Sequence, residues 1–215
     1  MPNSSKASPI FIVFEGLDGS GKTTQMDMLA DHLRQEGHDV HLTAEPTDFL
    51  PTGQLIRDVL QGKFAVDPRT LAALFAADRL QHLTQPKTGV LDRLANGQTV
   101  ISSRYYFSSL AYQAETGDLD WVAALNSQAR TLRKADITFF LDLSAQASMS
   151  RISQNRDRAE LFETEERLNR ARQAFDRAFE YWEEGEHLVR IDAGQDIIDV
   201  NKEIIQNLSS IQIPS

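Results

Sequence analysis

The stretch GLDGSGKT at residues 16–23 matches the phosphate-loop pattern G-x-x-x-x-G-K-[ST] at every fixed position. The apolar run Ile10–Phe14 precedes it and predicts a buried strand, while the residues from Thr24 onward predict a helix. Glycines allow backbone angles that turn several N–H groups toward phosphate oxygens, and the start of a helix adds positive potential. The stretch therefore predicts a strand–loop–helix unit that binds a nucleoside triphosphate.

Two side chains of this loop have expected roles of their own. Lys22 is placed to reach the β and γ phosphates, and the Thr23 hydroxyl to ligate Mg²⁺. The alternative interpretation is a glycine-rich turn with an accidental lysine. The motif alone does not separate a kinase from a GTPase or a motor. The residues expected to contact the donor nucleotide are Gly16, Leu17, Asp18, Gly19, Ser20, Gly21, Lys22, Thr23 and Thr24.

Continuous apolar runs recur along the chain and alternate with helical patterns. Runs of this kind are typical of parallel strands covered on both faces. The predicted fold class is therefore α/β, a three-layer doubly wound parallel sheet of about five strands. The predicted strands are Ile10–Phe14, Val40–Ala44, Thr99–Ser102, Ile137–Leu143 and Leu188–Ile191.

Helical spacing and end signals place helices between these strands. We expect a single domain over residues 9–215, preceded by a disordered tail at residues 1–8. Residues 150–160 are rich in arginine and irregular, which favours a mobile lid. The predicted helices are Gln25–Gln35, a helix opening at Asp67-Pro68 and running through Leu80, Glu163–Glu184 and Asp196–Leu208, with Ile211–Ser215 as a tail.

Composition narrows the class of protein. The chain has 215 residues, is 41% hydrophobic, contains no cysteine and carries a net charge of −9. The missing cysteines exclude a disulfide scaffold, a thiolate metal site and a cysteine nucleophile. The negative charge argues against a nucleic-acid-binding surface. No apolar run approaches the ~20 residues that span a bilayer, so we expect no membrane partner and a cytoplasmic location.

A GTPase also carries a phosphate loop, and it usually adds a motif that binds guanine. The nearest match to [NT]-K-x-D is Arg133-Lys134-Ala135-Asp136, which has the wrong first residue and precedes its strand instead of following it. A switch GTPase is therefore disfavoured.

Two further clusters extend the pattern beyond the loop. One is LFAADRLQH at residues 74–82, on the helix that opens near Asp67, and the other is SSRYYFSSLAYQ at residues 102–113, directly after the third strand. Ligands of open α/β sheets bind outside the carboxyl ends of the strands. The second cluster therefore opens at the same rim as the phosphate loop.

Four segments together resemble the thymidylate kinase family in order and spacing. They are EGLDGSGKTTQ at residues 15–25, EPT at 45–47, FAADR at 75–79 and the run from Arg104 to Gln113. The resemblance covers the chain from about Ile10 to the last helix. It implies the architecture of P-loop nucleoside monophosphate kinases, with transfer of the ATP γ-phosphoryl group to dTMP, use of Mg²⁺ and a homodimer.

The resemblance assigns roles around the acceptor nucleotide. Phe75 matches the aromatic residue that stacks on thymine, and Arg79 the arginine that bonds its O4. Arg104 matches the arginine that holds the dTMP phosphate, a task suited to a guanidinium fork. Asp18 matches the carboxylate at the sugar 3′-hydroxyl, and Tyr112 the ring that leaves no room for a ribose 2′-hydroxyl. Core packing for Phe75 and a solvent-facing acid for Asp18 are the alternatives.

Further contacts follow from the same comparison. Ser109 and Gln113 lie where the family offers polar contacts to the base, and Glu45 and Arg57 border the acceptor site. Three aromatic residues remain as packing side chains: Tyr105, Tyr106 and Phe107.

The expected lid supplies the remaining positive charge. Neither Gly19 nor Ser20 is basic, which resembles the bacterial type, in which lid arginines stabilise the transferred phosphoryl group. The alternative is a solvated basic turn balanced by nearby carboxylates. The candidates are Arg151, Arg156 and Arg158, and the last two are favoured.

Two positions depart from the family pattern. The family usually has Asp before the arginine of the second cluster, where this chain has Ser103, and many bacterial members have Arg before Glu-Pro, where it has Ala44. If the missing carboxylate matters for Mg²⁺, Glu165 and Glu166 are possible substitutes. Another monophosphate kinase and a non-catalytic nucleotide-binding protein remain as alternatives.

Overall fold

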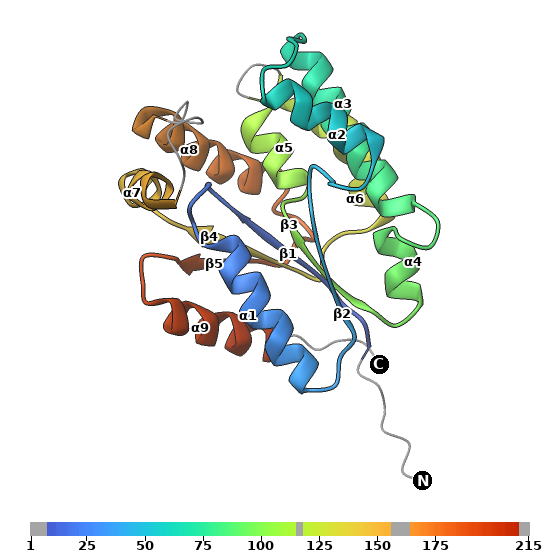
Figure 1. Ribbon diagram of the computed structural model, residues 1–215, viewed down its shortest axis with the longest axis vertical. Helices are drawn as coiled ribbons and strands as arrows, with labels where there is room; N and C mark the ends of the chain where they lie inside the picture. Colours follow the sequence, from blue (N-terminus) through green and yellow to red (C-terminus); the bar gives the residue numbers. More distant parts are fainter. Residues whose placement is uncertain (1–7, 115–117, 156–163, 211–215) are drawn as a thin grey trace.

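The sheet has five strands, all parallel, in the order β2-β3-β1-β4-β5 (Figure 1). The computed structural model describes residues 8–114, 118–155 and 164–210. The predicted fold class is confirmed, and the predicted strand ends differ from the observed ones by at most two residues. The strands are β1 (Phe11–Gly16), β2 (Val40–Ala44), β3 (Thr99–Ser103), β4 (Ile137–Asp142) and β5 (Leu188–Asp192).

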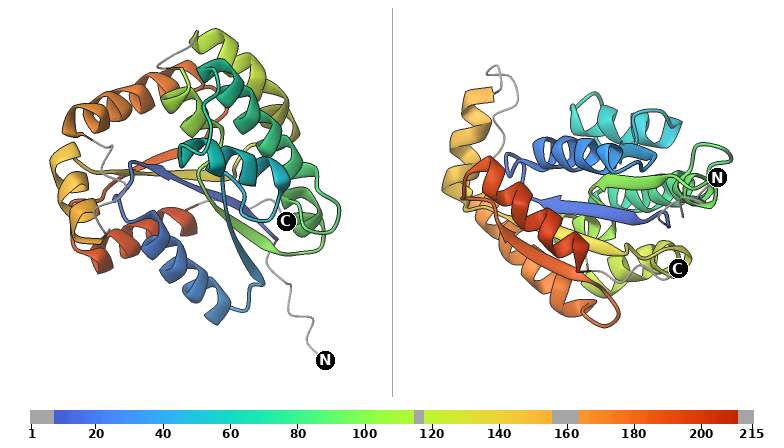
Figure 2. Two further views of the ribbon diagram at one scale, coloured as in Figure 1. Left: turned by 45° about the horizontal axis from the view of Figure 1, so that its top comes forward. Right: turned by 90° about the horizontal axis from the view of Figure 1, so that it is seen from below.

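Helices cover both faces of the sheet. Figures 1 and 2 show α1 and α9 on one face, with α5 and α8 on the other. Within the described residues the helices are α1 (Lys22–Gln35), α2 (Pro51–Leu60), α3 (Pro68–Thr84), α4 (Val90–Ala95), α5 (Tyr106–Tyr112), α6 (Leu119–Leu132), α7 (Ala145–Asn155), α8 (Glu165–Tyr181) and α9 (Ile197–Ser209).

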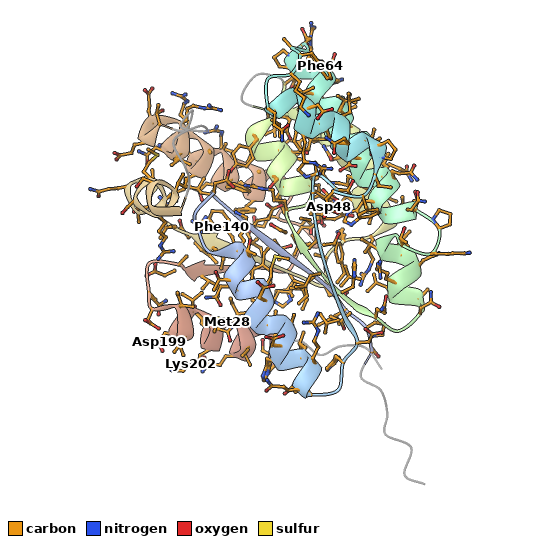
Figure 3. All side chains as sticks on the ribbon, viewed as in Figure 1. Met28, Asp48, Phe64, Phe140, Asp199 and Lys202 are labelled. Atoms are coloured by element: carbon orange, nitrogen blue, oxygen red, sulfur yellow. The ribbon has the colours of Figure 1, made fainter. Side chains whose placement is uncertain are left out.

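The central strand β1 shows how the sequence builds two cores. Phe11 and Val13 pack with the α5–α8 layer, whereas Ile12 and Phe14 pack with α1 and α9. Successive side chains of a strand point to opposite faces, so an unbroken apolar run serves both layers. Figure 3 shows Phe140 in the interior beside the sheet, where the rings of α8 meet it, while Asp199 and Lys202 point outward from α9.

The helix ends follow local capping signals. The side chain of Asp67 accepts the N–H of Arg69 at the start of α3, and Asp196 accepts that of Ile198 at the start of α9, both at 2.9 Å. These bonds satisfy donors that a helix leaves unpaired at its first turn. Helix α1 differs, because its N-cap is Gly21 and no side chain caps it.

The predicted lid begins as a helix. Residues 150–155 belong to α7, so the expectation of an irregular segment from residue 150 was wrong for this part. Ala145, Ser148 and Ile152 are buried at three- and four-residue spacing, which explains the helix. Residues 156–160 of the predicted lid, residues 1–7 of the predicted tail and residues 211–215 lie outside the described residues.

Candidate functional site

The phosphate loop lies between the end of β1 and the start of α1, at the carboxyl edge of the sheet. Gly16 has a φ of 145°, and a Cβ atom there would lie 2.8 Å from the carbonyl oxygen of Leu141. Gly19 has a φ of 78°, and its Cβ would lie 3.0 Å from the Ser148 carbonyl oxygen of α7. Backbone on both sides therefore excludes larger residues at these two positions.

Lys22 and Thr23 open helix α1. Lys22 is buried, and its Nζ donates to the carbonyl oxygens of Gly16 at 3.0 Å and Leu17 at 2.7 Å. The ammonium group thus arches back over the loop that it follows. The Leu17 side chain lies in the core, so Leu17 contributes to the loop through its backbone. Thr23 and Thr24 are exposed at the start of the helix, where the first backbone N–H groups have no partner within the helix.

A cavity of about 500 Å³ opens over this loop. Its size is that of a small-molecule site. Ile197 and Val200 of α9 add apolar surface beside the polar loop, which suits a ligand with a charged tail and a flat apolar part. The remaining walls are residues 18–25, Ser103, Arg104, Arg151, Ala193 and Gln195.

Arg104 reaches this cavity from the loop after β3. Its Nη2 donates to Asp18 Oδ1 at 2.6 Å, and its Nη1 to Ser108 Oγ at 3.1 Å. The guanidinium also lies over the Tyr112 ring, 5.1 Å from its centroid. Burial alone would lower the pKa of Arg104, but Tyr112, Asp18 and Glu15 outweigh it and raise the pKa, so the group stays charged.

Asp18 is the carboxylate between the loop and Arg104. Besides its bond to Arg104, its Oδ1 lies 4.0 Å from Lys22 Nζ. The two cations expected to hold two different nucleotides therefore border the same side chain. This arrangement brings the two predicted anion sites together.

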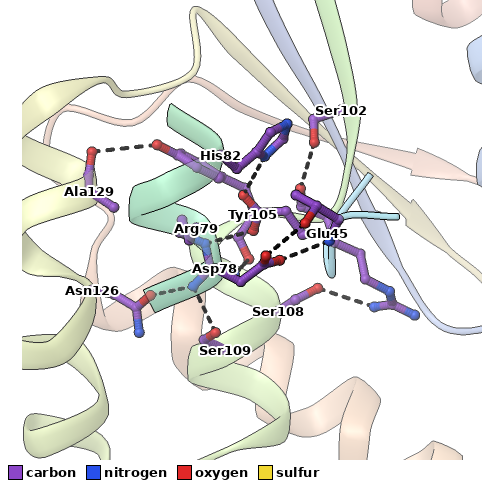
Figure 4. Close-up of polar contacts among 12 residues, drawn as sticks. Glu45, Asp78, Arg79, His82, Ser102, Tyr105, Ser108, Ser109, Asn126 and Ala129 are labelled. Atoms are coloured by element: carbon purple, nitrogen blue, oxygen red, sulfur yellow. Dashed lines mark hydrogen bonds and ion pairs between the residues drawn. The ribbon is translucent and has the colours of Figure 1, made fainter. Parts of the chain in front are cut away.

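Arg79 occupies a more enclosed position than the sequence suggests. It is 1% exposed, and its Nε donates to Glu45 Oε2 at 2.7 Å (Figure 4). Nη1 donates to Ser109 at 2.8 Å and to Asn126, and Nη2 to the carbonyl oxygen of Tyr105 at 3.0 Å. An arginine has five N–H groups. Bonds between described residues use four of them and leave one Nη2 hydrogen.

Glu45 is likewise a network residue. It is 4% exposed, and its Oε1 lies 3.0 Å from His82 Nδ1 while Oε2 holds Arg79. Figure 4 shows the Glu45 carboxylate between these two side chains of α3. Glu45 is expected at the border of the acceptor site, and the position that it takes there is behind Arg79. From there its carboxylate fixes the orientation of the guanidinium.

Phe75 and Arg57 lie on the two helices that follow β2. Phe75 is half-buried on α3 and belongs to neither of the two core clusters, which leaves its ring for another partner. Arg57 of α2 donates from Nη1 to the carbonyl oxygens of Thr47 and, at 3.4 Å, Pro46. Arg57 therefore holds the turn that follows Glu45.

The segment 105–113 begins with core residues and ends with partly buried ones. Tyr105, Tyr106 and Phe107 are at most 1% exposed, so their packing role is confirmed. Tyr112 is partly buried, with its ring edge-on to Phe175, and Gln113 follows it at the end of α5.

Among the lid arginines, Arg151 lies within the described residues. Arg156 and Arg158 lie outside the described residues. Arg151 lies on α7, lines the loop cavity, and its Nη1 would be 4.0 Å from a Cβ at Gly21. It donates to the Ala193 carbonyl oxygen at 3.0 Å. Arg151, the less favoured of the three candidates, is therefore the one that the described residues place at the loop cavity.

The two departures from the family pattern are neighbours. Ala44 and Ser103 are register partners on the parallel strands β2 and β3. Ser103 also lines a second cavity, of about 680 Å³, which runs along β2 and shares Thr23 with the loop cavity. Glu166 pairs with Arg170 on its own helix at 2.7 Å. Within the described part of the chain, no cluster of three or more acidic or histidine side chains forms a metal site.

The discarded guanine motif contains a residue with a structural role. Asp136, the last residue of the discarded guanine motif, accepts the Phe11 N–H at 2.6 Å and pairs with Arg133, so it ties two chain segments together.

Among the helices of the described residues, none is both long and apolar enough to cross a bilayer.

Comparison with known proteins adds a family to this geometry. A family model described as thymidylate kinase matches residues 14–204. A probable thymidylate kinase from Methanococcus aeolicus is 38% identical over 209 residues, covering 94% of this chain and 97% of the relative. One from Thermococcus kodakarensis is 38% identical over 211 residues, covering 94% and 98%. One from Methanocaldococcus jannaschii is 36% identical over 203 residues, covering 94% and 97%.

Proposed function

The chain belongs to the thymidylate kinase family, and on that premise we propose that it transfers the γ-phosphoryl group of ATP to dTMP, giving dTDP and ADP. The observation that carries the proposal is the contact between Asp18 and Arg104 at 2.6 Å. It joins a phosphate loop, the donor's site, to an arginine on the neighbouring strand end, the acceptor's site. A monophosphate kinase needs these two sites to meet.

ATP binds in the loop cavity. Residues 16–24 and the uncapped start of α1 supply N–H groups for its phosphates, and Lys22 turns from the loop carbonyl oxygens to the β and γ phosphates. Ile197 and Val200 offer apolar surface to the base at the other end of the cavity. Arg151 lies between these two ends and adds a third cation to Lys22 and Arg104.

Mg²⁺ suits the donor set of this site. The described residues offer two exposed hydroxyls at the loop, those of Thr23 and Thr24, and no acidic cage. Mg²⁺ commonly takes one or two protein ligands together with phosphate oxygens and water. Thr23 would hold it, and the bound ion would neutralise charge on the β and γ phosphates.

dTMP binds on the opposite side of Asp18. Arg104 holds its phosphate, Asp18 receives its 3′-hydroxyl, and Phe75 stacks on the base. Arg79 directs its remaining N–H at O4, with Ser109 and Gln113 beside it. Tyr112 fills the space of a ribose 2′-hydroxyl, while Glu45 and Arg57 hold the border of the site.

The reaction is an in-line displacement at the γ phosphorus. The attacking dTMP phosphate oxygen is already ionised, so no strong general base is needed. Catalysis depends on positioning and on cations that face the transferred group. Lys22 and Arg104 serve in this way, together with the lid arginines Arg156 and Arg158. Closure of the lid near residues 150–160 over the single domain of residues 9–215 excludes water.

We also propose a homodimer in the cytoplasm. Helix α2 carries the exposed apolar side chains Leu55 and Leu60, and α6 carries Trp121 and Leu132. Buried in a dimer, these side chains would leave water. Sedimentation measurements test the dimer, since a monomer at micromolar concentration contradicts it.

An ADP-release assay across a panel of acceptors tests the function. We expect turnover to be highest with dTMP, lower with dUMP, and lowest with UMP and AMP. Preference for AMP or UMP would identify a different monophosphate kinase. ATP binding without formation of ADP and dTDP would identify a non-catalytic protein, and a preference for GTP without an acceptor would identify a GTPase.

A further inference from the structure

Glu15 is a fully buried carboxylate that touches neither proposed nucleotide site directly. It is the residue before Gly16 on β1 and is 0% exposed. Its Oε1 accepts the N–H groups of Tyr105 at 2.9 Å and Ser108 at 3.1 Å, and its Oε2 accepts the Ser108 hydroxyl at 2.5 Å. Only donors face this carboxylate in these bonds, so its ionised form fits them, although burial raises its pKa.

The Ser108 hydroxyl links Glu15 to Arg104. A hydroxyl has one hydrogen and two lone pairs. Because that hydrogen is donated to Glu15 Oε2, a lone pair is turned toward Arg104 Nη1, which donates to Ser108 Oγ at 3.1 Å. The charge on Glu15 thus decides which way the Ser108 hydroxyl points, and hence whether Arg104 meets an acceptor or a hydrogen.

Glu15 also fixes the backbone on which Arg104 sits. Arg104 has a φ of 71°, a left-handed conformation that residues other than glycine rarely adopt. Its N–H donates to the Phe14 carbonyl oxygen at 2.8 Å, and the next N–H, that of Tyr105, donates to Glu15. The N-cap residue of α5 makes no capping bond with its side chain. The Glu15 carboxylate accepts the Ser108 N–H instead. Two successive residues of β1 therefore hold this turn.

We propose that Glu15 is a positioning residue for the acceptor phosphate, acting on Arg104 through Ser108 and the first turn of α5. This inference rests on the proposed role of Arg104 as the group that binds the dTMP phosphate. It predicts that the loss of charge at position 15 weakens the acceptor and not the donor, because the donor loop has bonds of its own.

The test is the binding of dTMP and ATP to Glu15→Gln, measured separately by calorimetry. Glutamine is nearly the same size, but its amide N–H groups face Ser108 and reverse the hydroxyl. We expect the Kd of dTMP to rise on the order of tenfold or more, as for a hydrogen bond within a charged network. The Kd of ATP should stay within about twofold, because its contacts are independent.

A double-mutant cycle separates positioning from general damage. In an Arg104→Ala background, Glu15→Gln should change dTMP affinity by less than about twofold, since the group on which it acts is gone. Glu186→Gln is the matched control: Glu186 is also a buried carboxylate bound to α5, accepting the Tyr106 hydroxyl at 2.6 Å. It should lower stability without changing the ratio of the two affinities.

Each outcome has a distinct meaning. If Arg104→Ala alone leaves dTMP affinity unchanged, the proposed acceptor site fails and this inference fails with it. If Arg104→Ala weakens dTMP but Glu15→Gln does not, or weakens it equally in both backgrounds, the positioning role alone is overturned. Should Glu15→Gln not fold, Ser108→Ala takes its place in the same cycle, with a smaller loss expected for dTMP and none for ATP.

Discussion

Asp18 Oδ1 lies 2.6 Å from Arg104 Nη2, which ties the phosphate loop after β1 to the turn after β3. Because β1 and β3 are adjacent and parallel, both turns emerge at one edge of the sheet. The carboxylate shares its oxygen with Lys22 at 4.0 Å. A single side chain thus lies between Lys22 and Arg104, the cations proposed for the donor and the acceptor.

Asp18→Asn should reduce recognition of the acceptor sugar. The amide keeps the size of the side chain but loses the charge that attracts Arg104 and accepts the 3′-hydroxyl. We expect kcat/KM for dTMP to fall on the order of tenfold or more. Comparison with 3′-deoxy-dTMP checks the role: the wild-type preference for the 3′-hydroxyl should shrink in the variant. An unchanged preference would mean that Asp18 does not meet this group.

Arg79→Ala should affect both stability and the acceptor. The substitution leaves the buried Glu45 without its arginine partner and with only His82 at its carboxylate, and the loss of one member of a buried ion pair costs about 3–5 kcal/mol. Urea unfolding at constant pH measures this loss. Where the variant remains folded, dTMP affinity should fall much more than ATP affinity. A stability loss of under 1 kcal/mol would show that the Glu45–Arg79 pair is not a structural element, in conflict with its burial.

Tyr112→Ala should relax discrimination between sugars. The ring is braced edge-on by Phe175 at 5.6 Å and carries the Arg104 guanidinium on its face. Its removal opens space for a 2′-hydroxyl, so the ratio of UMP to dUMP turnover should rise on the order of tenfold. Tyr112→Phe is the control and should keep the deoxyribose preference, because it retains the ring. The same ratio in all three proteins would exclude a steric gate.

Ser103→Asp should change the response to Mg²⁺. Ser103 borders the loop cavity together with Thr23, whose hydroxyl is the proposed ligand. A carboxylate at this edge adds a hard oxygen ligand of the kind Mg²⁺ prefers. We expect the Mg²⁺ concentration for half-maximal turnover to fall. Because Ala44 is the register partner of Ser103, adding Ala44→Arg should weaken the effect, since the guanidinium would compete with the ion for the new carboxylate. If neither variant changes the Mg²⁺ requirement, this edge of the sheet does not face the ion.

The sheet could be predicted from the sequence because its physical signal is local. The central strands are largely apolar runs whose successive residues pack into two cores, as β1 shows with Phe11 and Ile12. The phosphate loop was equally readable, since its pattern specifies the backbone directly. Helix α7 was not predicted, because the arginine-rich segment from residue 150 suggested an irregular lid, although Ser148 and Ile152 continue a buried stripe.

The site residues were harder to rank because their partners are distant in sequence. Nothing near Arg79 indicates that Glu45 and Asn126 enclose it, and both come from other elements. In the sequence, Glu15 is only a polar residue at the end of a strand. The structure places Ser108, 93 residues later, against its carboxylate. The residue types were visible in the sequence, but the tertiary bonds that decide their freedom were not.

The most direct measurement is the affinity of a compound that joins adenosine to thymidine through a chain of phosphates, titrated into the wild type, Lys22→Ala and Arg104→Ala. If two nucleotides meet phosphate to phosphate at Asp18, the compound should bind about a hundredfold or more tighter than ATP, as expected for tethered ligands. Each variant should weaken it, whereas ATP alone should depend on Lys22 and dTMP alone on Arg104. A compound that binds no tighter than ATP, and is indifferent to Arg104, would contradict the facing arrangement of the two sites.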